Sequence, residues 1–60
     1  MKNKTMYERL TDIEREYIEQ DGATKEEING SEPWDLIDFL TPLYKRYTDK
    51  WIELINRLTA

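Results

Sequence analysis

The chain has 60 residues, and it contains no cysteine and no histidine. These two absences exclude disulfide bonds, zinc sites with cysteine or histidine ligands, and catalytic triads that use histidine. Hydrophobic residues make up 38% of the sequence and charged residues 37%, which is typical of a folded soluble protein. A domain of this size buries only about 60% of its unfolded surface, so we expect a marginal core that gains from a partner.

The charge is distributed unevenly along the sequence, with a formal net charge of −4. Residues 5–38 hold eleven acidic side chains against three basic ones, a net charge of −8, whereas residues 39–60 have a net charge of +2. No basic stripe is present to neutralise phosphates, so we expect no direct nucleic-acid binding. No apolar run approaches the ~18 residues of a membrane span, and no signal-peptide pattern opens the sequence. We therefore expect no membrane contact and take the cytoplasm as the default compartment.

The first predicted element is an amphipathic helix over residues 5–20. Thr5 followed three residues later by Glu8 forms a capping box, which specifies the start of the helix. Gly22 suits the left-handed residue that ends a helix. The apolar residues recur at steps of four, three and four, as one helix face requires: Met6, Leu10, Ile13 and Tyr17.

A second capping-box pattern, Thr24 with Glu27, predicts a short turn or helix over residues 24–29. Ser31 then provides an N-cap for a third segment, and Pro33 falls in its first turn, where the missing N–H costs nothing.

The third segment is predicted to be one long helix over residues 32–58, kinked at Pro42. Its apolar residues share one arc about 180° wide, and Pro42 falls on the opposite, polar side. A proline on the outer face bends a helix and removes one hydrogen bond. A broken helix stays open as the alternative, with one helix that ends at Leu40 and a new one that begins with Thr41 as its cap.

The predicted fold is therefore all-α and a single domain over residues 1–60: a helical hairpin of a shorter N-terminal helix and a long C-terminal one. At 1.5 Å per residue, about 15 Å of the longer helix stays uncovered. We expect self-association or a partner to cover it. The long helix also carries a coiled-coil spacing, at Leu40, Tyr44, Tyr47, Trp51, Leu54 and Leu58.

That spacing is open to two interpretations. It is either the core against the first helix or, in part, an interface with a second copy or another protein. Large aromatic residues are favoured at interfaces. The predicted partner-binding residues are Trp34, Phe39, Trp51, Tyr44 and Tyr47.

The outward side of the first helix carries a row of carboxylates. Such a row has a spacing comparable to the phosphates of one nucleic-acid strand, so it can occupy a groove meant for DNA or RNA. The alternative is an ordinary solvated surface. The predicted acidic face consists of Glu8, Asp12, Glu16 and Glu19.

Glu14 falls instead within the apolar arc, between Leu10 and Tyr17. It either reaches solvent at the edge of the arc or meets a tyrosine hydroxyl or a base such as Lys50, because an unpaired buried carboxylate is costly.

The function expected from these features is non-enzymatic, with no metal and no cofactor. A helical hairpin of this size leaves no substrate pocket, and Glu-x-x-His metal motifs need a histidine. We expect a small acidic protein-binding module, an inhibitor or regulator that occludes a surface of a larger protein, of the kind common in phages and mobile elements. The alternatives are a nucleic-acid-mimicking inhibitor and a structural homo-oligomer.

Overall fold

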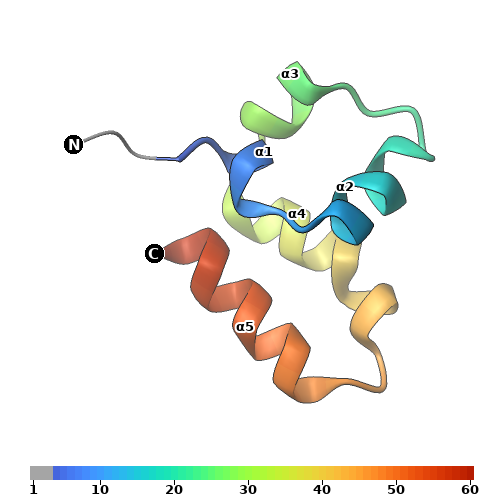
Figure 1. Ribbon diagram of the computed structural model, residues 1–60, viewed down its shortest axis with the longest axis vertical. Helices are drawn as coiled ribbons and strands as arrows, with labels where there is room; N and C mark the ends of the chain where they lie inside the picture. The colour runs from blue at the N-terminus through green and yellow to red at the C-terminus, as the bar shows by residue number, and fades with distance from the viewer. Residues whose placement is uncertain (1–3) are drawn as a thin grey trace.

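The computed structural model describes residues 4–60, which fold into five α-helices and one 3-10 segment (Figure 1). α5 lies along α4, α2 packs on α4, and α1 contacts both α3 and α5. The elements in chain order are α1 (Met6–Arg9), α2 (Asp12–Glu19), α3 (Lys25–Asn29), α4 (Pro33–Leu40), η1 (Thr41–Tyr44) and α5 (Thr48–Thr59). The all-α prediction is thus confirmed for the described residues. The two-helix hairpin is not found, because shorter helices replace both of its arms.

The predicted first helix is divided at Leu10. Leu10 is extended (φ −86°, ψ 149°) and buried, and the next residue, Thr11, is the N-cap of α2. The Thr11 hydroxyl accepts from the backbone N–H of Glu14, and the Glu14 carboxylate accepts from the backbone N–H of Thr11. The prediction of one helix over residues 5–20 is wrong because this second capping box starts a new helix within it.

The continuous long helix is also wrong. α4 ends at Leu40, and Pro42 lies in η1. Proline has no N–H for the carbonyl four residues back, and its ring clashes with that carbonyl in an α-helix. α5 begins only at Thr48, after Tyr47 has left helical geometry (φ −128°, ψ 72°).

The alternative of a broken helix is confirmed in its first part, because α4 ends at Leu40. Its proposed cap is wrong, because the Thr41 hydroxyl donates to the carbonyl of Ile37 (2.8 Å) and does not start a new α-helix. The apolar pattern persists across Pro42 because α5 folds back along α4 and both face one core. The ~15 Å of uncovered helix that suggested self-association is therefore absent.

The local signals between the long elements have mixed outcomes. The predicted capping boxes of Thr5 and Thr24 are both present, and Gly22 has a φ of +96°, as its place after α2 requires. Pro33 occupies the first turn of α4, as predicted. Ser31 is not the N-cap, because its hydroxyl donates to the carbonyl of Glu27 and the cap residue is Glu32, without a side-chain hydrogen bond.

The core is built by every α-helix or the residue that follows it, and its centre lies between α4 and α5. Its buried residues are Leu10, Ile18, Ile28, Leu36, Ile37, Leu40, Leu54 and Leu58. Among the described residues, no buried side-chain nitrogen or oxygen lacks a hydrogen-bond partner. None of the helices in this part of the chain combines the length and the hydrophobicity needed to cross a bilayer.

Candidate protein-binding surface

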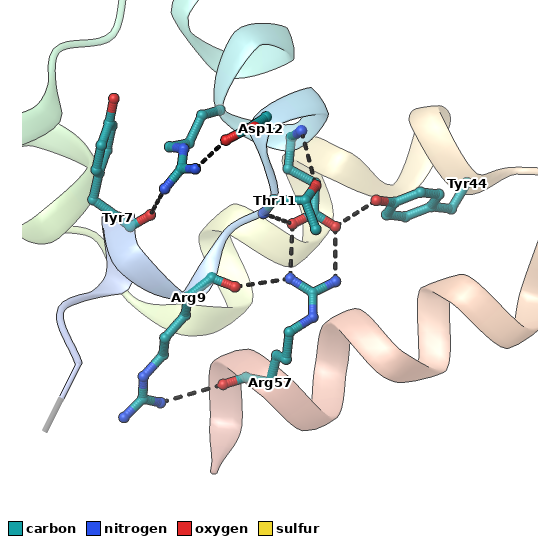
Figure 2. Close-up of polar contacts among 8 residues, drawn as sticks. Tyr7, Arg9, Thr11, Asp12, Tyr44 and Arg57 are labelled. Atoms are coloured by element: carbon teal, nitrogen blue, oxygen red, sulfur yellow. Dashed lines mark hydrogen bonds and ion pairs between the residues drawn. The ribbon is translucent and has the colours of Figure 1, made fainter.

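The carboxylate of Glu14 is fully buried although it carries a charge, and within residues 4–60 no other charged side chain is buried. Arg57 of α5 donates to both of its oxygens, at 2.8 and 2.9 Å, and the Tyr44 hydroxyl of η1 donates to one of them. Figure 2 shows Tyr44 and Arg57 reaching this point from different elements, beside the backbone of Thr11. One carboxylate therefore ties α2 to η1 and to α5.

These contacts determine the protonation state of Glu14. Burial alone raises the pKa of a carboxyl group, but the hydrogen bonds from Arg57, Tyr44 and the Thr11 amide, together with the Arg57 charge, lower the pKa of Glu14 overall. Burial and the hydrogen bond to Glu14 raise the pKa of Tyr44, so its hydroxyl keeps its proton. The sequence-based alternative in which Glu14 meets a tyrosine hydroxyl is confirmed, whereas its basic partner is Arg57 and not Lys50.

A second polar contact joins the first helix to the last. Arg57 also donates to the backbone carbonyl of Arg9 at 2.8 Å, and the Arg9 guanidinium donates back to the carbonyls at the end of α5 (Figure 2). These carbonyls have no partner within the helix, so a guanidinium there satisfies them and complements the helix dipole. The two arginines thus fix α1 against the end of α5.

Beside this network lies an apolar hollow of about 270 Å³, which we call the Tyr47 hollow. Two of its lining residues are large and exposed: Ile13 keeps 66% of its surface in solvent and Tyr47 keeps 59%. Ile13 comes from the first turn of α2, and Tyr47 from the residue before α5. The full lining consists of Thr11, Ile13, Leu43, Tyr44, Tyr47 and Lys50.

The ring of Tyr44 connects this hollow to the network behind it. Its hydroxyl is bonded to the buried Glu14, while its ring lines the hollow. Because Glu14 is in turn held by Arg57, one wall of the hollow is fixed by hydrogen bonds and needs no partner for its position. A rigid apolar wall next to exposed side chains is suited to bind another protein at low entropic cost.

The predicted partner-binding aromatics have three different environments. Tyr44 and Trp51 are partly buried and pack against the core, and the Trp51 indole N–H donates to the Thr41 hydroxyl at 3.1 Å. Tyr47 is exposed. The structure brings Tyr44 and Tyr47 together in one hollow. Trp51 lies on α5 and contacts η1 through Thr41, so its contact is within the chain.

Trp34 and Phe39, the other two predicted contacts, both lie on α4 and do not form one patch. Five residues apart, they are about 140° apart around the helix. Trp34 is 53% exposed, whereas Phe39 is 39% exposed and makes an edge-to-face contact with Tyr17, with 5.7 Å between ring centroids. Phe39 lines a second hollow, together with residues of α2 and α3.

The predicted acidic row is interrupted by the break at Leu10. Glu8 belongs to α1, so it is not in line with the three acids of α2, although all four are exposed. Most of these carboxylates also have partners inside the chain. Glu8 accepts from the Thr5 amide, Asp12 pairs with Arg15, and Glu19 accepts from the Tyr7 hydroxyl at 3.0 Å. The fourth acid of the predicted row, Glu16, is an exposed residue of α2.

Sequence reasoning missed Ile13, which it assigned to the core of the first helix, and the exposed Ile52 of α5. The signal for Ile13 is the motif Thr11-Asp12-Ile13-Glu14, a capping box that starts a helix at Asp12. Ile13 is exposed at this start, the reverse of what we expected, whereas Glu14 is buried, as its place in the apolar arc allowed. Ile52 lies within the predicted apolar arc, and we find no signal that would have placed it at the surface.

Comparisons with protein-family models, with the curated proteins and with the solved structures gave no match for this chain. In residues 4–60, no group of three or more acidic side chains is arranged to hold a metal ion. The surface of the protein itself is therefore the basis for its proposed function.

Proposed function

We propose that this protein is a non-enzymatic protein-binding module that acts as an inhibitor or regulator, by covering a surface of a larger protein with its Tyr47 hollow. The observation that carries the proposal is the pair Ile13 and Tyr47, two large apolar side chains exposed at 66% and 59% beside an apolar hollow. Exposed apolar side chains that gather around a hollow are typical of interaction sites.

The identity of residue 47 supports the proposal. Tyr47 is the N-cap of α5, where Ser, Thr, Asn or Asp would satisfy a backbone N–H, and its side chain makes no cap hydrogen bond. The same chain places a capping threonine before α1, α2 and α3. A tyrosine at this position therefore stabilises the start of α5 less than a capping residue would. A contact between Tyr47 and a partner is a physical reason for a tyrosine there.

The mechanism we propose is steric. Ile13 and Tyr47 insert into apolar sites of the partner, and the rest of the domain, 32 Å in its longest dimension, covers the surface around them. Lys50 at the edge of the hollow adds a positive charge that can pair with an acidic side chain of the partner. The proposal involves no chemical step.

The test compares two variants of the hollow with a control on α5. Ile13→Asp and Tyr47→Asp should each weaken binding to the partner captured by the wild-type protein by about thirtyfold, as expected when an interface anchor is lost. Both should remain folded, because an acidic residue is favoured in the first turn of α2 and at the N-cap of α5. Calorimetry or surface plasmon resonance measures the affinity, and urea denaturation measures the stability.

The matched control is Ile52→Asp, which removes another large exposed side chain but does not line the hollow. It should bind like the wild type. If Ile52→Asp loses binding and the two hollow variants keep it, the proposed surface is wrong. If Glu16→Lys is instead the change that weakens binding, and the affinity falls steeply with salt, the protein is a nucleic-acid mimic. If the wild-type protein binds no partner protein, it is a structural oligomer.

A further inference from the structure

A second hollow, which we call the Phe39 hollow, lies among α2, α3 and α4 and has a volume of about 180 Å³. Its base is apolar, because Ile18, Ile28 and Leu36 are buried core residues that line it. Phe39 stands at its edge, 39% exposed and held by the edge-to-face contact with Tyr17. The hollow is therefore preformed by the core and has one aromatic ring at its edge.

Two carboxylates complete this edge. Asp35 lies four residues before Phe39 on α4 and hence on the same helix face, and Asp21 comes from the turn after α2. Both are exposed, and neither side chain has a hydrogen bond or an ion pair with any described residue.

No basic side chain lines the Phe39 hollow. The nearby base in the sequence, Lys25, is directed elsewhere, with its ammonium 5.4 Å from the centre of the Tyr7 ring. An apolar base, an aromatic edge and two unpaired carboxylates together fit a side chain that has an aliphatic stem and a cationic head.

We propose that the Phe39 hollow receives a basic side chain, with arginine preferred, from a segment of a partner protein. The stem packs on Ile18 and Leu36, and the guanidinium lies between Asp21 and Asp35 beside the Phe39 ring. Arginine is preferred over lysine because its planar head stacks on aromatic rings and binds carboxylates with two hydrogen bonds. This site is separate from the Tyr47 hollow and does not depend on the function proposed for it.

The size and charge of the site support this occupant. A hollow of 180 Å³ is smaller than the roughly 300–1,000 Å³ of typical small-molecule pockets, and it suits a single long side chain. Residues 5–38, which form all of its walls except Phe39, have a net charge of −8. A partner segment with basic residues is attracted to this surface before contact, and an acidic one is repelled.

The test uses n-butylguanidinium as the probe, with the neutral isostere n-butylurea and the anion pentanoate for comparison, followed by NMR of the isotope-labelled protein. Butylguanidinium should shift the signals of Ala23, Ile28 and Phe39 and should bind at least fivefold more tightly than butylurea. Pentanoate should not bind. Added salt should weaken butylguanidinium binding and leave butylurea unchanged.

A double variant, Asp21→Asn with Asp35→Asn, should lower the affinity for butylguanidinium about fivefold. The matched control, Glu32→Gln with Asp38→Asn, removes the same charge from exposed positions that do not line the hollow and should bind like the wild type. Equal binding of butylguanidinium and butylurea, equal loss in both double variants, or shifts confined to other residues would overturn the proposal. If the Asn variant does not fold, the salt dependence of the wild type decides.

The outcomes for the two hollows are distinguishable. Tyr47→Asp should bind butylguanidinium as the wild type does, because the Tyr47 hollow shares no lining residue with the Phe39 hollow. A loss of partner binding in Tyr47→Asp, together with a failure of the probe, would leave the proposed function intact and remove only this inference.

Discussion

Among single residues, Glu14 is the one whose ion-pair partner we expect to matter most for the free energy of unfolding. It is fully buried, and Arg57, which is one-third exposed, supplies its charge partner. We predict that Arg57→Met lowers the free energy of unfolding at neutral pH by about 2–3 kcal/mol, because an unpaired buried carboxylate remains. Urea denaturation measures this loss. Arg46→Met, which removes an exposed arginine, is the control and should change stability by less than about 0.5 kcal/mol.

The pH dependence of the same variant makes the prediction more specific. In the wild type the pKa of Glu14 is lowered from its ordinary value near 4.5, so its stabilising contribution is present above that pH and is lost as the pH falls through the lowered value. In Arg57→Met, burial is opposed only by the hydrogen bonds from Tyr44 and Thr11, so the pKa of Glu14 is higher than in the wild type, and the penalty is relieved as the pH falls through that higher value. The difference in stability should therefore narrow on acidification. A difference that is the same at about pH 7 and about pH 4.5 would contradict this explanation.

At the scale of elements, the junction between α4 and α5 depends on the hydroxyl of Thr41. It donates to the carbonyl of Ile37 and accepts from the Trp51 indole, so it links the end of α4 to α5. We predict that Thr41→Val lowers the free energy of unfolding by about 1 kcal/mol more than Thr59→Val does. Thr59 is the matched control, because its hydroxyl also donates to the carbonyl four residues back but accepts no bond from another side chain. Equal losses in the two variants, measured by chemical denaturation, would show that the Trp51 bond does not stabilise the junction.

The elements also show which local features can be predicted from sequence. The capping boxes of Thr5 and Thr24 and the left-handed Gly22 depend on residues within a few positions, and they are confirmed. The capping box at Thr11 has the same form, but it was missed because the apolar spacing continues across it. Pro42 shows the converse: a continuous apolar pattern is equally compatible with one helix and with two that face the same core.

The candidate sites depend on contacts over longer distances and were only partly predictable. Tyr44 and Tyr47 were expected at a partner surface, but the hollow that they line also needs Ile13, which lies far away in the sequence. Likewise, Asp21 and Phe39 line one hollow although they come from the turn after α2 and from α4. Sequence periodicity assigns residues to a face of one helix, and it contains no information on which face of another helix will lie opposite.

At the scale of the whole molecule, the core is complete within one chain, so we expect a single chain to fold alone. Ile37, Leu40 and Leu54 are completely buried within a single chain, and the uncovered helix that suggested self-association or a partner is absent. We predict that the melting temperature stays constant over about a hundredfold range of protein concentration. Circular dichroism measures it. A melting temperature that rises with concentration would show that self-association contributes to folding, and sedimentation equilibrium would then give the number of chains.

The contacts of Arg57 determine when during its synthesis the protein can fold. This residue closes on Glu14 and on Arg9, which are 43 and 48 residues earlier in the chain. Loops of this length must close before these contacts form, and such non-local contacts slow folding relative to a simple helical bundle. A growing chain that still lacks α5 has no charge partner for the Glu14 carboxylate and no Leu54 or Leu58 for its core. Folding therefore waits until α5 has been synthesised and has left the ribosome.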